Sequence, residues 1–267
     1  MFKISSISLK GEIFSKYLKR NVAFRVVAPP NYRDSNIRFP VLLMNDGQDY
    51  GGLQLENTIE TYHTCHEHRP FIYIGIETDK NRIHEYGTAV LADFKNRGSR
   101  AGLYTKFIIE EFIPFLKGEF KVSYDGLDWF FCGMSLGGLS AFDIVLNHPE
   151  YFSKAGVFSG SFWWRKKAYD PNDEEDRSRI VLNMVRDSNY HSHLKFWFEC
   201  GTLDEKADRN KNGIIDSIDD TKDLITELEK KGYNKPDDIT YVEINEGRHD
   251  LATWASVFPD FLKWAFG

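Results

Sequence analysis

The sequence predicts an α/β fold in which helices cover both faces of a mostly parallel central sheet, and three observations support this expectation. Short apolar runs rich in β-branched and aromatic residues recur along the chain, as in strands that are buried on both faces. Amphipathic stretches of helical period separate these runs, and such alternation is typical of a doubly wound sheet. The length of 267 residues suits one large domain, and no linker divides it. We therefore expect residues 1–267 to form a single domain.

Composition and charge exclude several classes of protein. Apolar residues make up 42% of the chain and aromatic residues 15%, which is enough buried surface to offset the entropy of ordering the chain. The 34 basic and 40 acidic residues give a net charge of −6, the wrong sign for binding nucleic-acid phosphates. No apolar stretch reaches the roughly 20 residues of a membrane span, and the N-terminus has no apolar block like that of a signal peptide. We expect neither nucleic acid nor membrane as a partner. The three cysteines lack metal-binding spacing and indicate a reduced, cytoplasmic protein; the oligomeric state stays open.

The individual elements follow from the same patterns. The predicted strands, in chain order, are residues 24–28, 41–44, 71–77, 129–132, 155–158, 194–200 and 239–244. The predicted helices are residues 102–120, 139–146, 179–185, 219–231 and 251–266. The segment 219–231 opens with acidic residues and ends in Lys-Lys-Gly, which suits the helix dipole and a glycine C-cap.

Residues 162–193 are longer than the other connections between predicted strands. They contain an acidic, turn-prone piece at 170–176, and the helix predicted at 179–185 follows it. In an α/β fold, excess length of this kind lies above the carboxyl ends of the strands, where ligands bind. We interpret the segment as a lid-like insertion, and a solvated surface insertion is the alternative.

The strongest motif is Cys-Gly-Met-Ser-Leu-Gly-Gly at residues 132–138. Ser135 stands between Gly133 and Gly137, with a predicted strand before it and a helical run after it. This context is that of a nucleophile elbow, a sharp turn that exposes the serine hydroxyl and in which larger side chains two residues away would clash. We therefore predict that Ser135 is a nucleophile. The alternative is an ordinary glycine-rich turn between a strand and a helix.

A nucleophilic serine needs a base, and the base needs an orienting acid. In this type of fold they follow in the chain order Ser, Asp or Glu, His. Asp204 comes directly after a predicted buried strand and is the predicted acid; Glu205 is the local alternative, and Glu199 lies within the strand and is expected to face elsewhere. His249 follows the last predicted strand, is the last histidine of the chain, and is the predicted base. Its alternative role is a residue at a helix N-terminus, with Asp250 as the cap.

Two backbone amides are needed to stabilise the oxyanion of the reaction. The amide of Leu136, directly after the serine, is one predicted donor. The amide of Gln48, in the loop after the strand at 41–44, is the other. Trp163 and Trp164 follow a predicted strand end next to the elbow and are predicted to form walls of a pocket for an aromatic or sugar acyl ester. Packing in the core is the alternative for both.

Several motifs together resemble one family. They are Asp-Gly-Gln after a Val-Leu-Leu strand, Gly-Met-Ser-Leu-Gly-Gly, Ser-Gly-Ser-Phe-Trp-Trp at 159–164, Gly-Thr-x-Asp at 201–204 and a late Gly-x-His-Asp. Over roughly residues 20–267 the chain resembles the putative-esterase family, which has the α/β-hydrolase fold. That family includes enterochelin esterase-like siderophore esterases, feruloyl and acetyl-xylan esterases, S-formylglutathione hydrolases and mycolyltransferases. The segment 82–86 also resembles a part of this family that follows the fourth strand.

The resemblance implies an α/β-hydrolase fold, Ser135, Asp204 and His249 as a triad, and the amides of Gln48 and Leu136 as the oxyanion hole. The loop Asn-Asp-Gly differs from the His-Gly of many relatives and is closer to the siderophore-esterase branch. Full-length enterochelin esterases have a further N-terminal domain, for which this length leaves no room. We expect a serine esterase that needs no cofactor for catalysis, with a small acyl, feruloyl or acetyl sugar, or siderophore-type ester as substrate.

Two alternatives to ester hydrolysis follow from the same features. An acyltransferase would pass the acyl group to a sugar hydroxyl instead of water. A catalytically inactive, calcium-dependent carbohydrate-binding protein is the other alternative.

Residues 208–219 form a second candidate site. Set against the twelve-residue calcium loop, their oxygen-bearing residues fall at the ligand positions, and Gly213 falls at the sharp turn. The predicted calcium ligands are Asp208, Asn210, Asn212, Ile214 through its carbonyl, Asp216 and Asp219. We expect a structural calcium ion that stiffens the segment holding the catalytic acid. An Asx-rich turn that caps the following helix is the alternative.

Overall fold

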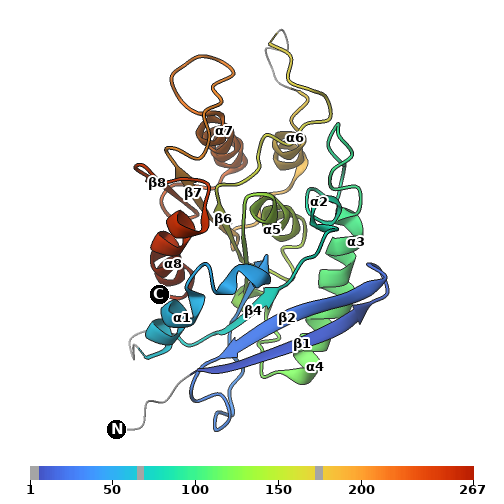
Figure 1. The fold of residues 1–267 in the computed structure, drawn as a ribbon, viewed down its shortest axis with the longest axis vertical. Coiled ribbons are helices and arrows are strands. Elements are labelled where there is room, and N and C mark those ends of the chain that lie inside the picture. The colour runs from blue at the N-terminus through green and yellow to red at the C-terminus, as the bar shows by residue number, and fades with distance from the viewer. Residues whose placement is uncertain (1–5, 65–68, 172–176) are drawn as a thin grey trace.

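The computed structural model describes residues 6–64, 69–171 and 177–267, and within them one eight-stranded sheet runs through the molecule (Figure 1). The strands lie in the order β1-β2-β4-β3-β5-β6-β7-β8. Their bounds are β1 Ile7–Ser15, β2 Arg20–Ala28, β3 Val41–Asn45, β4 Ile72–Ile76, β5 Trp129–Met134, β6 Lys154–Phe158, β7 Lys195–Gly201 and β8 Ile239–Ile244. The seven predicted strands are confirmed, with small differences at their ends.

The sheet is mostly parallel, as predicted. Strand β1 pairs antiparallel with β2, and β2 pairs antiparallel with β4; the remaining neighbours are parallel. In the parallel part, the register pairs Met134 with Phe158 and Gly201 with Ile244. The carboxyl ends of β5, β6, β7 and β8 therefore meet along one edge of the sheet, where parallel α/β sheets bind their ligands.

Helices cover both faces of the sheet, and each face has its own apolar core. The larger core lies under α3 (Ala101–Lys106), α4 (Ile113–Glu119), α5 (Leu136–Asn147), α6 (Ile180–Asp187) and α7 (Asp216–Lys231), with a π-helical segment, Phe107–Phe112, between α3 and α4. The smaller core lies under α1 (Leu55–Thr64) and α8 (Leu251–Phe266), which pack side by side (Figure 1). Short turns of helix complete the chain: α2 (Arg82–Glu85) and the 3-10 turns Gly47–Tyr50 and Gly126–Asp128.

The apolar runs of the sequence are explained by these two cores. On β3, Val41 and Leu43 belong to the larger core, whereas Leu42 and Met44 belong to the smaller one. Every position of such a strand is buried, so no polar residue interrupts the run. The five predicted helices are confirmed, and the long one at 102–120 includes the π-helical segment.

Within the segment 162–193, Phe162, Trp164 and α6 pack onto the larger core, whereas residues 166–171 are exposed; residues 172–176 lie outside the described residues. Helix α6 coincides with the helix predicted at 179–185, and its residues Ile180, Val181, Leu182 and Val185 are buried. Arg179 is buried just before α6 and pairs with Asp220 of α7. A lid-like role for the segment stays a prediction. Across the described ranges, we find no helix with both the length and the apolar character of a membrane span.

Candidate active site

Ser135 lies at the turn from β5 into α5, and its backbone is strained. Its φ of 55° and ψ of −122° are outside the regions that non-glycine residues normally adopt. A Cβ added at Gly133 would collide with the backbone of Gly137, and one at Gly138 would lie 2.8 Å from the carbonyl oxygen of Gly133. Strand and helix thus approach each other too closely for larger residues, which is the geometry of a nucleophile elbow.

The Ser135 hydroxyl is partly exposed beside the end of β6. Its amide donates to the carbonyl of Phe158 (2.8 Å), and its carbonyl accepts from the amide of Ser161 (3.2 Å). The Oγ atoms of Ser135 and Ser161 lie 3.4 Å apart. Both backbone groups of Ser135 are therefore fixed to the next strand, while its hydroxyl faces the edge of the sheet.

The two predicted oxyanion donors lie on either side of the elbow. Leu136 is the first residue of α5, so its amide has no acceptor within the helix. The loop that carries Gln48 packs against the elbow, since Asn45 donates from Nδ2 to the carbonyl of Gly137 (2.7 Å). The Gln48 side chain turns away from Ser135: its Oε1 accepts from the amide of Thr78 (3.0 Å). The role of the two amides stays a prediction.

A buried ion pair that the sequence did not reveal fixes this loop. Asp46 has a left-handed backbone, and its carboxylate accepts from Arg82 at both oxygens, from Nε at 2.6 Å and from Nη2 at 2.7 Å. Its amide donates to the hydroxyl of Tyr86 (3.1 Å). Such a bidentate pair fixes geometry as well as charge. The only signal for it in the sequence was the resemblance of residues 82–86.

Asp204 follows β7 and lies close to the loop of the predicted base. Both carboxylate oxygens are buried, and neither makes a hydrogen bond of normal geometry among the described residues. Burial raises the pKa of Asp204, while the nearby Ser159 side chain and His249 act in the opposite direction. Glu205 instead interacts with the backbone of Ser217 on α7. Of the two candidate acids, only Asp204 faces the base.

His249 lies in the loop between β8 and α8, and this loop is tied to the Asp204 loop. The Leu203 amide donates to the carbonyl of Gly247 (2.8 Å), and the Thr202 amide donates to that of Ile244 (3.0 Å). The Asp250 side chain caps α8 by accepting from the amide of Thr253 (2.9 Å). His249 itself stands just before the helix, as the prediction requires of a base on a loop.

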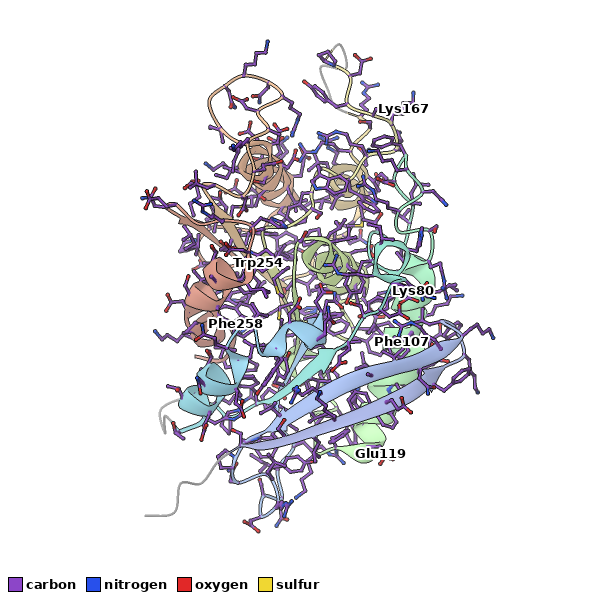
Figure 2. The ribbon with its side chains drawn as sticks, viewed as in Figure 1. Lys80, Phe107, Glu119, Lys167, Trp254 and Phe258 are labelled. Atoms are coloured by element: carbon purple, nitrogen blue, oxygen red, sulfur yellow. The ribbon has the colours of Figure 1, made fainter. Side chains whose placement is uncertain are left out.

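The His249 ring lies edge-on to Trp254 of α8, with centroids 5.1 Å apart and an interplanar angle of 78°. Trp254 in turn donates from Nε1 to the hydroxyl of Ser159 (2.9 Å), at the end of β6. Figure 2 labels Trp254 on α8. Desolvation lowers the pKa of His249, and the positive charge of Arg82 lowers it further. The negative charge of Asp204 has the opposite effect. A lowered pKa keeps the imidazole neutral, which is the state that a general base needs.

Ser135, Asp204 and His249 thus lie at the ends of β5, β7 and β8, around the end of β6. The Asp204 and His249 side chains are close enough to shift each other's pKa. Within the described ranges, the His249 ring makes no hydrogen bond to Ser135 or Asp204. Catalytic hydrogen bonds often tighten only when substrate binds.

A pocket of about 400 Å³ lies next to the Asp204 loop and the residues after β6. Trp163 contributes a partly exposed ring to it, over which the Arg97 guanidinium lies at 4.3 Å. The pocket is lined by Phe94, Arg97, Trp163, Arg165, Tyr169, Glu205, Arg209 and Asp216. Aromatic walls and charged groups that converge on one space are typical of a ligand pocket.

Trp164 does not share this role. It is fully buried, its Nε1 donates to the carbonyl of Leu91 (3.3 Å), and its ring packs against Gly87 and Gly98. The prediction of Trp164 as a pocket wall is therefore wrong for this structure, and the core alternative holds. Neighbouring residues point to different sides of the chain, so only Trp163 reaches the pocket.

Four of the predicted calcium ligands meet in one loop above α7. Asn210 and Asn212 both donate from Nδ2 to the same oxygen of Asp219, at 2.9 Å each. The Asp208 carboxylate accepts from the amide of Asn212 (3.1 Å). The loop has the shape of an Asx-rich turn, which was the alternative interpretation.

The remaining predicted ligands lie differently. The Asp216 carboxylate pairs with the Arg209 guanidinium (3.2 Å), and Ile214 is partly exposed. Over the ranges that the structure describes, no three His, Cys, Asp or Glu side chains are grouped to hold a metal ion. Calcium binding by this loop stays a prediction, and it would require Asp216 to leave Arg209.

Comparison with known proteins gives one family match, a relative of similar length and several structures of similar fold. The sequence matches the family described as "Putative esterase" over residues 15–265. It is 25% identical to the uncharacterized protein YbbA of Bacillus subtilis, over 97% of this chain and 98% of that protein. The structure is similar to a ferulic acid esterase, with a TM-score of 0.72 at 16% identity and 98% of each chain covered. It is also similar to the enterobactin esterase FES of Shigella flexneri, with a TM-score of 0.75 at 17% identity, over 97% of this chain and 58% of that one.

Proposed function

Because the chain belongs to the Putative esterase family and has the α/β-hydrolase fold, we propose that it is a serine esterase that hydrolyses carboxylic esters through an acyl-enzyme on Ser135. The observation that carries this proposal is the strained backbone of Ser135 at the N-terminus of α5. A serine is held in this way where its hydroxyl must reach a substrate and its neighbouring amides must stabilise an oxyanion. The mutually hydrogen-bonded loops of Asp204 and His249 lie beside it.

In the proposed reaction, the Ser135 hydroxyl attacks the ester carbonyl while His249 accepts its proton. Asp204 orients the imidazole and stabilises its charged form. The amides of Leu136 and Gln48 donate to the oxyanion. His249 then passes the proton to the leaving alcohol, and water resolves the acyl-enzyme by the same steps. None of these steps requires a cofactor.

We propose an ester with an aromatic part as the substrate. The partly exposed ring of Trp163 lines a pocket with Phe94 and Tyr169, and this wall can stack against a planar group. The name of one structural neighbour, ferulic acid esterase, points to an ester of an aromatic acid. Acetyl-sugar and siderophore-type esters are the other candidates.

The test of the nucleophile is the substitution Ser135→Ala. We expect the rate of p-nitrophenyl acetate hydrolysis to fall by roughly three orders of magnitude or more, as when a triad nucleophile is removed. A fluorophosphonate probe should label the wild type and not this variant. The matched control is Ser256→Ala, an exposed serine of α8, which should keep both properties. Near-normal hydrolysis by Ser135→Ala would refute the proposal.

The test of the substrate class compares feruloyl, acetyl and siderophore esters, in the wild type and in Trp163→Ala. We expect the variant to raise KM for the aromatic ester more than for the acetyl ester. Product analysis in the presence of a sugar acceptor should give the free acid, whereas transfer of the acyl group to the sugar would identify an acyltransferase.

A further inference from the structure

Glu199 is a buried carboxyl on β7 that the proposed mechanism does not use. Side chains alternate along a strand, so Glu199 shares a face with Trp197, which packs against α8. Its cross-strand neighbours are Phe158 on β6 and Val242 on β8, which pack in the same core. The prediction that Glu199 faces elsewhere is therefore wrong: its fully buried side chain lies on the face that α8 covers, and the loop of His249 leads into α8.

A second carboxyl lies beside it. Gly201 is two residues further along β7 and points to the same face, and Asp204 Oδ1 lies 2.7 Å from the position that a Cβ at Gly201 would take. The Asp204 carboxylate thus folds back over the strand toward Glu199. All four oxygens of the two carboxyls are buried, and none has a hydrogen-bond partner among the described residues.

Ser159 faces both carboxyls and lowers the pKa of each. Its hydroxyl accepts from Trp254 (2.9 Å), so its own proton is available to one of them. One hydroxyl proton cannot serve two buried carboxylates. Backbone amides at Ser159 and Gly201 also lie near the pair, and a proton held by one of the two carboxyls would supply a further donor.

The titratable groups that interact with Glu199 come from its own strand and loop and from β8, and they are Asp204, Cys200 and Tyr241. Asp204 in turn interacts with His249 and Asp250 in the loop before α8. Burial raises the pKa values of Cys200 and Tyr241, so both stay neutral near pH 7. Burial raises the pKa of Glu199 to about 8, and the charge of Asp204 contributes in the same direction. Two adjacent carboxylates in such surroundings cannot both be charged without a large cost.

We propose that Glu199 is a positioning residue whose proton is shared with Asp204, so that the pair keeps one negative charge beneath His249 and the Asp204 carboxylate stays aimed at the imidazole. This inference rests on the proposed triad. A neutral carboxylic acid donates a hydrogen bond, and so replaces the water that Asp204 has lost. The single charge stabilises the imidazolium that forms during the reaction.

The first test exploits the resemblance between glutamine and a protonated glutamate. We expect Glu199→Gln, which keeps a neutral donor, to retain kcat close to that of the wild type at pH 7. Glu199→Leu, which has no donor, should lose about tenfold or more in kcat with little change in KM, the rate equivalent of one lost buried hydrogen bond. Thermal unfolding of both variants shows whether they are folded at the assay temperature.

The second test uses pH. As pH rises through about 8, Glu199 loses its proton, and repulsion displaces Asp204, so kcat of the wild type should fall. Glu199→Gln should lack this fall. The matched control is Asp143→Asn, which removes another buried carboxyl but lies on α5, where Asp143 accepts from the amide of Ala89. The Asp143→Asn variant should therefore keep the fall of kcat at high pH.

The third measurement is independent of turnover. The infrared spectrum below pH 8 should contain the carbonyl stretch of a protonated carboxylic acid that Glu199→Gln removes and Asp143→Asn leaves in place. Absence of this band, or a loss of kcat in Glu199→Gln as large as in Glu199→Leu, would overturn the inference. Because the band does not depend on catalysis, it separates a failure of this inference from a failure of the proposed esterase activity.

Discussion

At the scale of single residues, burial shifts the pKa values of the proposed base and its acid in opposite directions. Desolvation lowers the pKa of His249 and keeps its ring neutral, whereas burial raises the pKa of Asp204 next to it. The Arg82–Asp46 pair has its carboxylate buried and both hydrogen bonds made, so it fixes the loop that carries Gln48. For His249 and Asp204, the surroundings therefore shift the pKa away from its ordinary value.

Asp143 gives a pH-dependent prediction of stability. Burial raises its pKa from 3.8 to about 7. The folded chain therefore binds this proton more tightly than the unfolded chain, and stability from this group falls as pH rises from about 4 to about 7. We expect Asp143→Asn to reduce this pH-dependent loss of unfolding free energy by up to about 4 kcal/mol, as measured by urea unfolding at acidic and neutral pH. An unchanged pH dependence of the unfolding free energy would contradict this.

The candidate site residues could be named from the sequence because Ser135, Asp204 and His249 each follow a predicted strand. The direction in which a side chain points could not be predicted in the same way, because it depends on how far the chain turns after the strand. The sequence therefore misjudged the side chains of Trp164 and Glu199. The pairing of Asp46 with Arg82 could not be derived from the residue pattern, and only the resemblance of residues 82–86 pointed to that segment.

At the scale of elements, the sequence predicted seven strands of the sheet but not the edge strand β1. Strand β1 pairs only with β2, and most of its side chains are exposed, so it has no continuous apolar run. Helix α7 begins three residues earlier than predicted, at Asp216, because the calcium-like loop ends in its first turn. The apolar pattern predicts an element well where both of its faces or one long stripe are buried.

Gly201 is where β7 and the loop before α8 meet, and it gives a prediction at this scale. A Cβ there would collide with the backbone of Gly247, which cannot move without moving His249. We expect Gly201→Ala to lower kcat/KM at least tenfold, an effect of about 1.4 kcal/mol on the barrier. The control is Gly118→Ala, because a Cβ at this position meets nothing within 4 Å. This substitution should leave activity unchanged and stabilise α4 by up to about 1 kcal/mol. Equal activity of the two variants would show that the loops are not coupled through Gly201.

The loop at 208–219 gives the metal prediction. We expect calcium to raise the thermal midpoint, because Asp208 and Asp219 would exchange bonds to amide nitrogens for bonds to the ion. Calorimetry with calcium and then chelator measures this, and Asp219→Asn should weaken binding. Asp260→Asn, an exposed carboxylate of α8, is the control and should bind as the wild type does. No heat of binding and no shift of the midpoint would leave the loop as an Asx-rich turn.

At the scale of the whole molecule, the site joins the two cores. Ser135 leads into α5, which packs on the larger core, and His249 leads into α8, which packs on the smaller one. The same strands serve both cores: on β5, Phe131 belongs to the larger and Phe130 to the smaller. Ser135 and His249, the proposed nucleophile and base, are therefore aligned only while helices on opposite faces of the sheet are both in place.

This arrangement predicts that loss of packing under α8 reaches the active site. Phe258 of α8, labelled in Figure 2, is fully buried. Its ring stacks on Phe158 of β6, with ring centroids 5.6 Å apart. We expect Phe258→Ala to lower the free energy of unfolding by about 3–5 kcal/mol, as for other large-to-small changes in a core. Since the two cores share their strands, the loss of esterase activity and the change in tryptophan fluorescence should have the same denaturation midpoint in this variant. That midpoint should lie at a lower denaturant concentration than in the wild type.

Phe14→Ala is the matched control, because Phe14 is 60% exposed on β1 and its loss should cost no more than about 0.5 kcal/mol. If activity in Phe258→Ala disappears well before the fluorescence change, α8 opens by itself and carries His249 away from an intact sheet. In that case, the stability of the triad would be set by one helix. Coincident transitions would instead mean that the base stays with the nucleophile for as long as the sheet exists, because β6 contributes Phe158 to the packing under α8 and the carbonyl that holds the Ser135 amide.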